Sequence, residues 1–434
     1  MFSNEAVRLL LASKYIVDRP IEKRIGWRNV DGGVIEAFRH HDPKWQEYVH
    51  NPSLLLHQDG PSSLTPLIVE SGDRAGSRIF PKAGTFMGTD FDAMSMFVKP
   101  VPVQPRHYTR IGLVGYNCNT GLGELNRQIA THCNIERWLV QPHPTVATNA
   151  NLDVDTIICP GGLKVEEFVK SVDTILFCER PLYPELLTSA KIHRKRVVCI
   201  PMMEWMPSGA KGWPEQVDLF VCPTQQCYDI FKDNVPCIYF PWPVDVQRFN
   251  YQPRDICHKF LFINGHGGFG GRKGGEVIRQ ALNIWPTLPL LVRSQKSDNW
   301  PVGVEILPEE PSNTMIYSKG DVLISPHSVD GLGLEPMEAM ACGMPVISTN
   351  GLPWNEIPAI TRINSRIEKR RVRRPVDWYL PDADHLVAIC KNLLSQNIRS
   401  ASMEARAWAE AHTWNESTVA RFERILRGEE TIGS

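Results

Sequence analysis

The feature that most constrains the fold of this chain is a double alternation of short apolar runs with amphipathic stretches, interrupted by a proline-rich segment. The apolar runs before the prolines are residues 111–115, 156–159, 174–177, 197–200 and 219–222, and those after them are residues 259–264, 289–293, 321–325 and 344–348. Continuous apolar strands separated by helices are typical of parallel sheets covered on both faces. The pattern therefore predicts an α/β protein with two such sheets.

Proline marks the boundary between the two alternations. Pro236 is followed by Pro241-Trp242-Pro243, which cannot lie inside a helix or a central strand, so we expect a linker here. Two Rossmann-like domains with parallel sheets would then face each other across a cleft, at the carboxyl ends of their strands, where ligands of such sheets bind. The predicted parts are an N-terminal extension, two Rossmann-like domains and a C-terminal helix packing back across them, at residues 1–105, 106–243, 244–405 and 406–434.

Composition excludes several classes of protein. A net charge of -1 over 434 residues lacks the overall positive charge of a dedicated nucleic-acid binder. The 11 cysteines are single, without a Cys-x-x-Cys pair, which argues against a zinc ribbon or a redox motif and favours buried, reduced thiols. No run approaches the roughly 20 apolar residues of a membrane helix, and we see no signal peptide. These observations predict a cytoplasmic protein without a transmembrane segment.

The most informative stretch, residues 321–349, reads DVLISPHSVDGLGLEPMEAMACGMPVIST. A strand is followed by a glycine-containing loop, residues 331–333, and by a helix that begins near Pro336. Backbone N–H groups at such a helix start attract anions. Asp330 and Glu338 flank the loop, and Glu335 shares a helical face with Glu338. Such carboxylates are suited to accept hydrogen bonds from vicinal sugar hydroxyls.

This stretch resembles the signature of the retaining GT-B glycosyltransferases of the large Glu-x7-Glu family, glycosyl transferases group 1. The family pattern EGFGLPLLEAMACGLPVI corresponds here to DGLGLEPMEAMACGMPVI. The first acid is Asp330 rather than Glu and is one methylene shorter, so its reach towards a donor sugar differs. The resemblance implies that Glu338 binds the ribose of the donor and that Asp330, with the backbone of Gly331, Leu332, Gly333 and Leu334, binds the sugar; Glu335 is a further donor-binding candidate.

A second stretch, residues 260–282, reads FLFINGHGGFGGRKGGEVIRQAL and resembles the first strand, loop and helix of the family's donor domain. The family's Arg and Lys hold the donor diphosphate there. Lys273 matches the family lysine, while the longer loop places Arg272 next to it and His266 nearer the usual position of the arginine. Cations at this point would stabilise the charge that develops on the leaving diphosphate.

Weaker matches lie elsewhere in the chain. Residues 116–124 resemble the glycine-rich loop that faces the donor phosphates and the acceptor, which makes Gly121, Gly123 and Asn119 candidates. Residues 238–249 resemble the interdomain run, and residues 406–426, with Thr413-Trp414, resemble the closing stretch. A histidine that relatives often carry after a first-domain strand is missing, and Glu179 or His193 is the candidate to replace it on the acceptor side.

The resemblance implies a GT-B fold with the acceptor bound to the first domain and a nucleoside diphosphate sugar bound to the second. It also implies a metal-independent hexosyl transfer with retention and no cofactor beyond the nucleotide sugar. The acceptor stays open among a glycan, a lipid-linked glycan, a protein and a nucleic acid. Residues 1–105 lie outside the resemblance and carry no motif. They are interpreted as an N-terminal extension whose role the sequence does not reveal, and the alternative is that they form part of the acceptor domain.

Six cations lie between residues 366 and 374, where relatives have a variable loop: Arg366, Lys369, Arg370, Arg371, Arg373 and Arg374. A solvated loop is the simplest interpretation, and a docking patch for an anionic surface is the alternative. Two other functions therefore stay open. One is a glycosyltransferase acting on a modified base of a nucleic acid, and the other is a catalytically inactive GT-B module that serves as a scaffold.

Overall fold

The computed structural model describes most of the chain beyond residue 107. It covers residues 108–149, 154–158, 163–207, 212–265, 271–295, 299–308 and 313–430. The chain divides into two compact units, Met1–His107 and Tyr108–Ser434. In the first unit the described parts are two antiparallel strand pairs, β1 (Ile25–Arg28) with β2 (Val34–Ala37) and β3 (Leu67–Ile68) with β4 (Arg78–Ile79). Most of residues 1–105, expected to be an N-terminal extension or part of the acceptor domain, lie outside the described residues.

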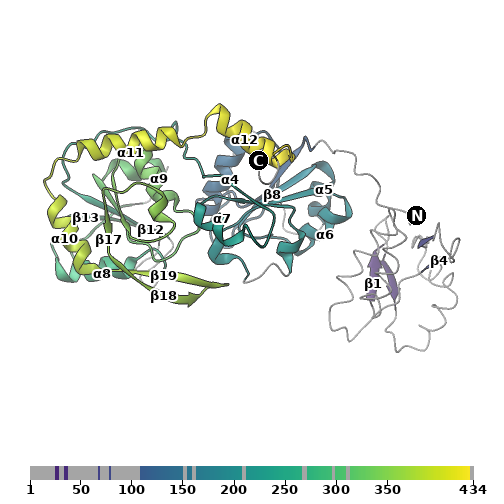
Figure 1. Ribbon diagram of the computed structural model, residues 1–434, viewed down its shortest axis with the longest axis horizontal. Helices are drawn as coiled ribbons and strands as arrows, with labels where there is room; N and C mark the ends of the chain where they lie inside the picture. The colour runs from purple at the N-terminus through teal and green to yellow at the C-terminus, as the bar shows by residue number, and fades with distance from the viewer. Residues whose placement is uncertain are drawn as a thin grey trace. The chain divides into compact units, whose positions relative to one another are not determined.

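The first half of the second unit is a seven-stranded parallel sheet with the order β11-β10-β9-β8-β5-β6-β7 (Figure 1). Its strands are β5 (Ile111–Gly115), β6 (Ile135–Val140), β7 (Asp155–Ile158), β8 (Thr174–Cys178), β9 (Arg196–Ile200), β10 (Leu219–Cys222) and β11 (Cys237–Tyr239). Its helices are α4 (Gly121–His132), α5 (Leu163–Ser171), α6 (Pro184–Ile192) and α7 (Gln225–Phe231), with 3-10 turns η2 (Met203–Trp205) and η3 (Trp213–Gln216). The linker begins later than predicted from the prolines, because Pro236 directly precedes the edge strand β11 and only Pro241 and Pro243 follow that strand.

The second half is a six-stranded parallel sheet with the order β14-β13-β12-β15-β16-β17. Its strands are β12 (Phe260–Gly265), β13 (Leu290–Ser294), β14 (Glu305–Ile306), β15 (Val322–Ser325), β16 (Val346–Thr349) and β17 (Thr361–Ile363). Its helical segments are α8 (Gly275–Ile284), η4 (Asn313–Ser318), α9 (Leu334–Ala341), η5 (Trp354–Glu356) and α10 (Ala383–Leu393). Two parallel sheets with covering helices confirm the predicted pair of Rossmann-like domains.

The order of each sheet determines which loops face a ligand. In the first sheet, successive strands are added on one side of β5 and then, from β8 onward, on its other side. The second sheet has the same change of side between β12 and β15. Loops leaving the carboxyl ends of strands on either side of such a switch point diverge and open a crevice. The four loops that carry the predicted site residues are therefore the loops after β5, β8, β12 and β15.

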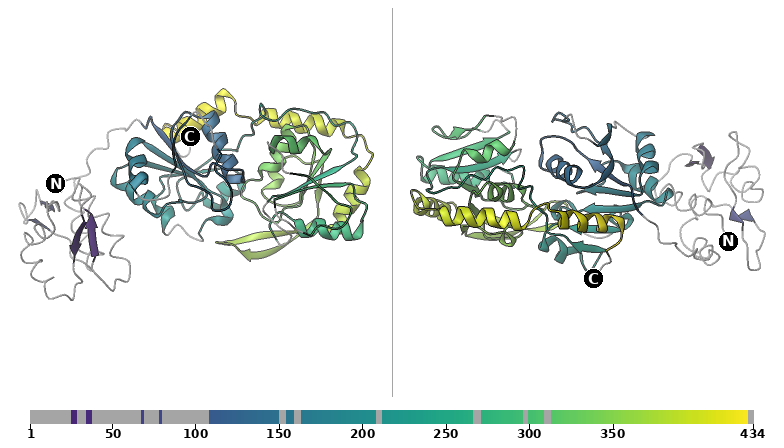
Figure 2. Two further views of the ribbon diagram at one scale, coloured as in Figure 1. Left: turned by 180° about the vertical axis from the view of Figure 1, so that it is seen from behind. Right: turned by 90° about the horizontal axis from the view of Figure 1, so that it is seen from above.

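The C-terminal stretch, predicted as one helix, is two helices (Figures 1 and 2). The first, α11 (Arg399–Ala411), packs on α9 of the second half, and the second, α12 (Glu416–Arg427), packs on β8 of the first half. The break is held by the linker, because Val244 donates its N–H to the His412 carbonyl at 2.8 Å. Asn415 then caps α12 by accepting a hydrogen bond from the N–H of Thr418 at 2.9 Å.

The cationic run is a strand and not the loop that the sequence suggested. Residues of β18 (Ser365–Arg371) pair antiparallel with β19 (Pro375–Pro381), and the hairpin leaves the second half after β17 (Figure 1). Val376 packs in the core of the first half, and Arg374 lies over the ring of Phe231 at 5.2 Å. The hairpin therefore joins the two halves of this unit.

The core explains why the two halves form one unit. Each half buries its own apolar cluster, and a third cluster runs from one half to the other, with Leu125, Leu261 and Phe422 all 2% exposed or less. Within it Trp242 of the linker packs edge to face on Trp414 at 5.4 Å. Ten described cysteines are free and buried, and none of the described helices is long and apolar enough to span a membrane.

Phe422 is fully buried where α12 meets the linker, so Phe422→Ala should lower the free energy of unfolding by about 3–5 kcal/mol because of lost transfer energy and a residual cavity. Urea denaturation followed by tryptophan fluorescence measures this change. Met403→Ala on α11, 56% exposed, is the control and should stay within about 0.5 kcal/mol. Equal effects of the two substitutions would contradict the packing of α12.

Candidate active site

A cavity of about 360 Å³ lies where the carboxyl ends of the two sheets meet within the second unit. The first half contributes Asn119 to Leu122 after β5, Glu179 after β8 and Glu204 after β9. The second half contributes Arg272 and Lys273 after β12, Arg293 at the end of β13, and residues on both sides of the start of α9. Its volume is within the range of small-molecule sites, roughly 300–1,000 Å³.

The loops after β12 and β15 touch through their backbones. Gly274 has a φ of +83°, which favours glycine, and a Cβ atom on it would lie 2.0 Å from the carbonyl oxygen of Pro326. The N–H of Ser328 donates to the Arg272 carbonyl at 2.8 Å. This close approach brings Lys273 beside the carboxylates that follow β15, although 57 residues separate it from Asp330.

Lys273 is held by two carboxylates, the buried Asp330 and the partly buried Glu335. Its Nζ donates to Asp330 Oδ2 at 2.9 Å and to Glu335 Oε1 at 2.6 Å. Burial alone would lower the pKa of Lys273, but Asp330 and Glu335 raise it. Burial would raise the pKa of Asp330, but Lys273 and Arg272 hold it well below its usual value. The lysine is therefore charged, and Asp330 is ionised at neutral pH.

Arg272 connects the two halves across the cavity. Its Nη1 forms an ion pair with Glu204 of the first half and lies 3.6 Å from Asp330 Oδ1. Glu204 is 1% exposed, and burial raises its pKa even though Arg272 opposes the shift. The pair resists separation of the halves at this point, because removing one partner would leave a buried charge uncompensated.

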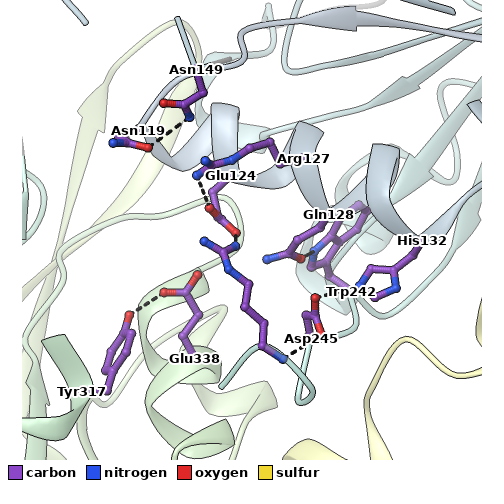
Figure 3. Close-up of polar contacts among 11 residues, drawn as sticks. Asn119, Glu124, Arg127, Gln128, His132, Asn149, Trp242, Asp245, Tyr317 and Glu338 are labelled. Atoms are coloured by element: carbon purple, nitrogen blue, oxygen red, sulfur yellow. Dashed lines mark hydrogen bonds and ion pairs between the residues drawn. The ribbon is translucent and has the colours of Figure 1, made fainter. Parts of the chain in front are cut away.

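Glu338 differs in charge state from its neighbours. It lies on α9, is buried, and accepts a hydrogen bond from Tyr317 of η4 (Figure 3). Burial and then the charge of Glu335 raise the pKa of Glu338 to about 7, although Tyr317 favours the ionised form. Asp330 and Glu338, the two acids of the predicted motif, therefore line one cavity in different electrostatic surroundings.

A second acid of the first half faces Glu338. Glu124 on α4 accepts hydrogen bonds from Arg127, at 2.6 Å, and from Arg248 of the segment after the linker (Figure 3). The N–H of Arg248 donates to Asp245, whose other oxygen contacts His132 Nε2 at 2.9 Å. The segment between the two halves is thus fixed by a chain of polar contacts that begins at Glu124, which lines the cavity.

Glu179 follows β8 and lines the cavity from the first half. Its φ of +68° is uncommon for a residue with a side chain and indicates a constrained turn. Burial and then the charge of Glu204 raise the pKa of Glu179 to about 7. Its described ionic contact is Arg180 Nε at 4.0 Å. A residue predicted as a replacement for the missing histidine is thus a carboxyl group whose pKa is near 7.

The other predicted site residues fall into three groups. Asn119, Gly121, Leu332, Gly333, Leu334 and Glu335 line the cavity. Gly123 and Gly331 do not; a Cβ on Gly123 would meet the Cys118 backbone and one on Gly331 would meet Glu204 and Met202, so these glycines permit close packing of the site loops. His193 caps α6 and contacts Glu166 at 3.6 Å rather than the cavity, and His266 lies outside the described residues.

Sequence reasoning missed several lining residues, among them Glu124, Glu204, Ile316 and Tyr317. Glu204 could have been suspected because it is a lone acid shortly after the buried strand at 196–200. Tyr317 gave no signal, since nothing local distinguishes it from a core aromatic residue. Its role depends on η4 packing against α9.

The cationic hairpin is partly neutralised by its own acids. Lys369 pairs with Asp377, and Arg366 and Arg370 both contact Glu368. Arg370 also lies over Trp378 at 4.8 Å. These contacts account for part of the positive charge, and the structure does not favour a nucleic-acid acceptor over the other classes.

One group of side chains has the composition of a metal site. A ligand atom each of His327, Asp330 and Glu335 lies within 4.8 Å of the others. Lys273 already bonds to both carboxylates, and burial followed by the charge of Lys273 lowers the pKa of His327. In this arrangement the ammonium group occupies the position that a cation would take.

Comparisons with known proteins agree with this geometry. Residues 301–357, which include Asp330, Glu335 and Glu338, match the family described as Glycosyl transferases group 1. Sucrose-phosphate synthase from Thermosynechococcus elongatus has a similar fold, with a TM-score of 0.51 at 16% identity over 74% of this chain and 99% of that one. Anabaena Alr3699/HepE in complex with UDP and glucose is similar with a TM-score of 0.52 at 14% identity, again over 74% and 99%.

None of the curated proteins matches the sequence. At these identities the structural likeness shows the fold alone, and it confirms the predicted GT-B architecture. The match of residues 301–357 agrees with the predicted family.

The raised pKa of Glu338 predicts that its burial lowers the free energy of unfolding in a pH-dependent way. The pKa of this carboxyl group rises from 4.5 to about 7 on folding, because the folded protein disfavours its ionised form. The free energy of unfolding therefore falls as pH rises through that interval. Glu338→Gln, which still accepts the Tyr317 hydrogen bond, should raise the free energy of unfolding at pH 8 by on the order of 3 kcal/mol. The gain should shrink towards pH 5 in urea denaturation.

Glu335→Gln is the matched control on the same helix. Lys273 lowers the pKa of Glu335 against the effect of burial, so its contribution to stability is present above the pKa of the unfolded chain and is lost as pH falls. This substitution should therefore destabilise the protein at pH 8. The same sign for both variants would contradict the assigned charge states.

Proposed function

We propose that this chain transfers a sugar from a nucleoside diphosphate sugar to an acceptor with retention of configuration. The match of residues 301–357 to the glycosyl transferases group 1 family and the GT-B fold support this proposal. The observation that carries the proposal is the ion cluster on the cavity wall, in which Lys273 and Arg272 converge on Asp330 within reach of Glu335. Positive charge set at the start of a helix is what a departing diphosphate requires.

In the proposed complex, Lys273 and Arg272 bind the diphosphate, and the N-terminus of α9 adds its dipole. Lys273 already donates charge-assisted hydrogen bonds to two carboxylates. A phosphate group could replace one of these acceptors, and the lysine would still have an anionic partner. Glu338 accepts the ribose hydroxyls, and Asp330 with the backbone of residues 331–334 orients the sugar.

Acceptor binding is proposed for the first half, beside Asn119 and Glu179. With a pKa of about 7, Glu179 is able to donate or accept a hydrogen bond at neutral pH. In a retaining transfer on one face of the sugar, the leaving phosphate takes the proton of the acceptor hydroxyl. The cations then need to stabilise the diphosphate as its charge increases. No step of this scheme calls for a metal ion.

The proposed location is the cytoplasm. The ten described cysteines are free and buried, which supports a reducing environment.

The donor can be identified by thermal unfolding in the presence of UDP-, GDP- and ADP-sugars. A ligand that binds the folded state at one hundred times its dissociation constant stabilises by about 2.7 kcal/mol, so the matching nucleotide should raise the midpoint by several degrees. An inactive scaffold would release no free sugar from any donor that it binds. Stabilisation by none of the nucleotides would count against the proposed substrate class.

Glu338→Ala should reduce sugar transfer by orders of magnitude, because the ribose hydroxyls lose their acceptor and the donor loses its orientation. Donor hydrolysis or transfer, followed by release of nucleoside diphosphate, measures the loss. Glu276→Ala on α8, an exposed acid of the same half, is the control and should retain full activity. Near-normal turnover by Glu338→Ala would defeat the assignment of Glu338.

A further inference from the structure

Arg293 is a buried cation in the cavity wall that no described carboxylate neutralises. It ends β13 and is 8% exposed. Its one described hydrogen bond runs from Nη1 to the carbonyl of the adjacent Ser294 at 3.3 Å. A guanidinium group has five N–H donors, so most of its hydrogen-bonding capacity faces the cavity without a partner among the described residues.

The other cavity cations differ from Arg293 in this respect. Lys273 bonds to Asp330 and Glu335, and Arg272 pairs with Glu204. Their charges are compensated by the protein itself. Of the three cations that line the cavity in the described part of the chain, Arg293 is the one whose charge is left to a ligand.

Arginines with a structural role in the same half, whether buried or partly buried, donate to several groups of the protein. Arg254 donates to the carbonyl oxygens of Gln252, Cys342 and Tyr317. Arg362 donates to Ser348 and to the carbonyls of Trp354 and Ile357 at 2.6–2.9 Å. Each fixes several backbone segments. Arg293 fixes none beyond its own neighbour, so a purely structural role does not explain its burial.

The place of Arg293 in the sheet directs it to the cavity. β13 is parallel to β12, with Arg293 opposite Ile263 and Ser294 opposite Gly265, after which the chain leads to Arg272 and Lys273. Leu291, two residues earlier on the same face of the strand, packs in the core that joins the halves. At the carboxyl end of β13 the same face of the strand borders the cavity, so Arg293 lies where a ligand would bind.

We propose that Arg293 is a further anion-binding residue of the donor site and that its counter-charge is the diphosphate of the nucleotide donor. A buried, uncompensated guanidinium costs several kcal/mol unless an anion pairs with it, and its planar fork suits two phosphate oxygens. The inference rests on the proposed function for the identity of the donor. The residue itself is selected by its burial, its missing partner and its strand position.

Inorganic pyrophosphate is the probe, because it carries the diphosphate without a base or a sugar. Isothermal titration of the full chain should show pyrophosphate binding that Arg293→Gln weakens at least tenfold, as expected for losing a charge-assisted bond worth about 1.5–3 kcal/mol. Arg293→Lys keeps the charge without the fork and should lie between the two. Arg279→Gln, which removes an exposed arginine paired with Glu276 on α8, should change the affinity less than twofold.

Thermal unfolding of the same variants separates a ligand-binding residue from a structural one. Removing an uncompensated buried charge should leave the midpoint of Arg293→Gln equal to or above that of the wild type. A midpoint lowered by more than about 5 °C would make Arg293 structural and overturn the inference. Wild-type protein that does not bind pyrophosphate, or Arg293→Gln that binds it equally well, would also overturn it.

Turnover of nucleotide sugars distinguishes this inference from the proposed function. If the wild type releases nucleoside diphosphate and Arg293→Gln keeps its pyrophosphate affinity, the function stands and the role of Arg293 is wrong. If pyrophosphate binding depends on Arg293 while no nucleotide sugar is turned over, Arg293 is an anion-binding residue and the transferase proposal fails.

Discussion

The site depends on the ion cluster centred on Asp330. Lys273 and Arg272 come from the loop after β12, Glu335 comes from the start of α9, and Glu204 comes from the opposite half. Each charge is buried or partly buried at a cost that its partners offset, so the geometry of four chain segments is tied to one set of bonds. The same cluster lowers the pKa of Asp330 and Glu335. Glu338, one turn farther along α9 and outside the cluster, keeps a raised pKa.

Local patterns were sufficient to predict most of the fold. Buried parallel strands appear in the sequence as continuous apolar runs, and the runs at 111–115 and 174–177 differ from β5 and β8 by at most one residue. The motif of residues 321–349 identified Asp330 and Glu338, because its loop and helix start are encoded within a few consecutive residues. Lys273 was identified in the same way, and its 2.9 Å contact with Asp330 brings the two motifs together.

Long-range contacts could not be predicted from these patterns. Glu204 and Tyr317 line the cavity because distant segments fold onto it, and neither residue type nor spacing distinguishes them in the sequence. Helical periodicity continued across residues 412–415, so the break between α11 and α12 was missed; it arises from a bond to Val244 of the linker. The cationic run was interpreted as a loop because its charges suggested solvent, whereas cross-strand pairing with β19 makes it a strand.

The position of α12 has a consequence for how the protein is made. Thr174 of β8 donates to the carbonyl of Leu426, and Arg196 of β9 donates to that of Ile425 at 3.3 Å. The first half thus completes its apolar surface with residues that lie about 250 positions farther along the chain. A ribosome releases the chain from its N-terminus, so these strands leave the exit tunnel long before their covering helix exists. The apolar surface that α12 covers therefore stays exposed from the time these strands emerge until α12 has been synthesised, and during this interval chaperones have a surface to protect.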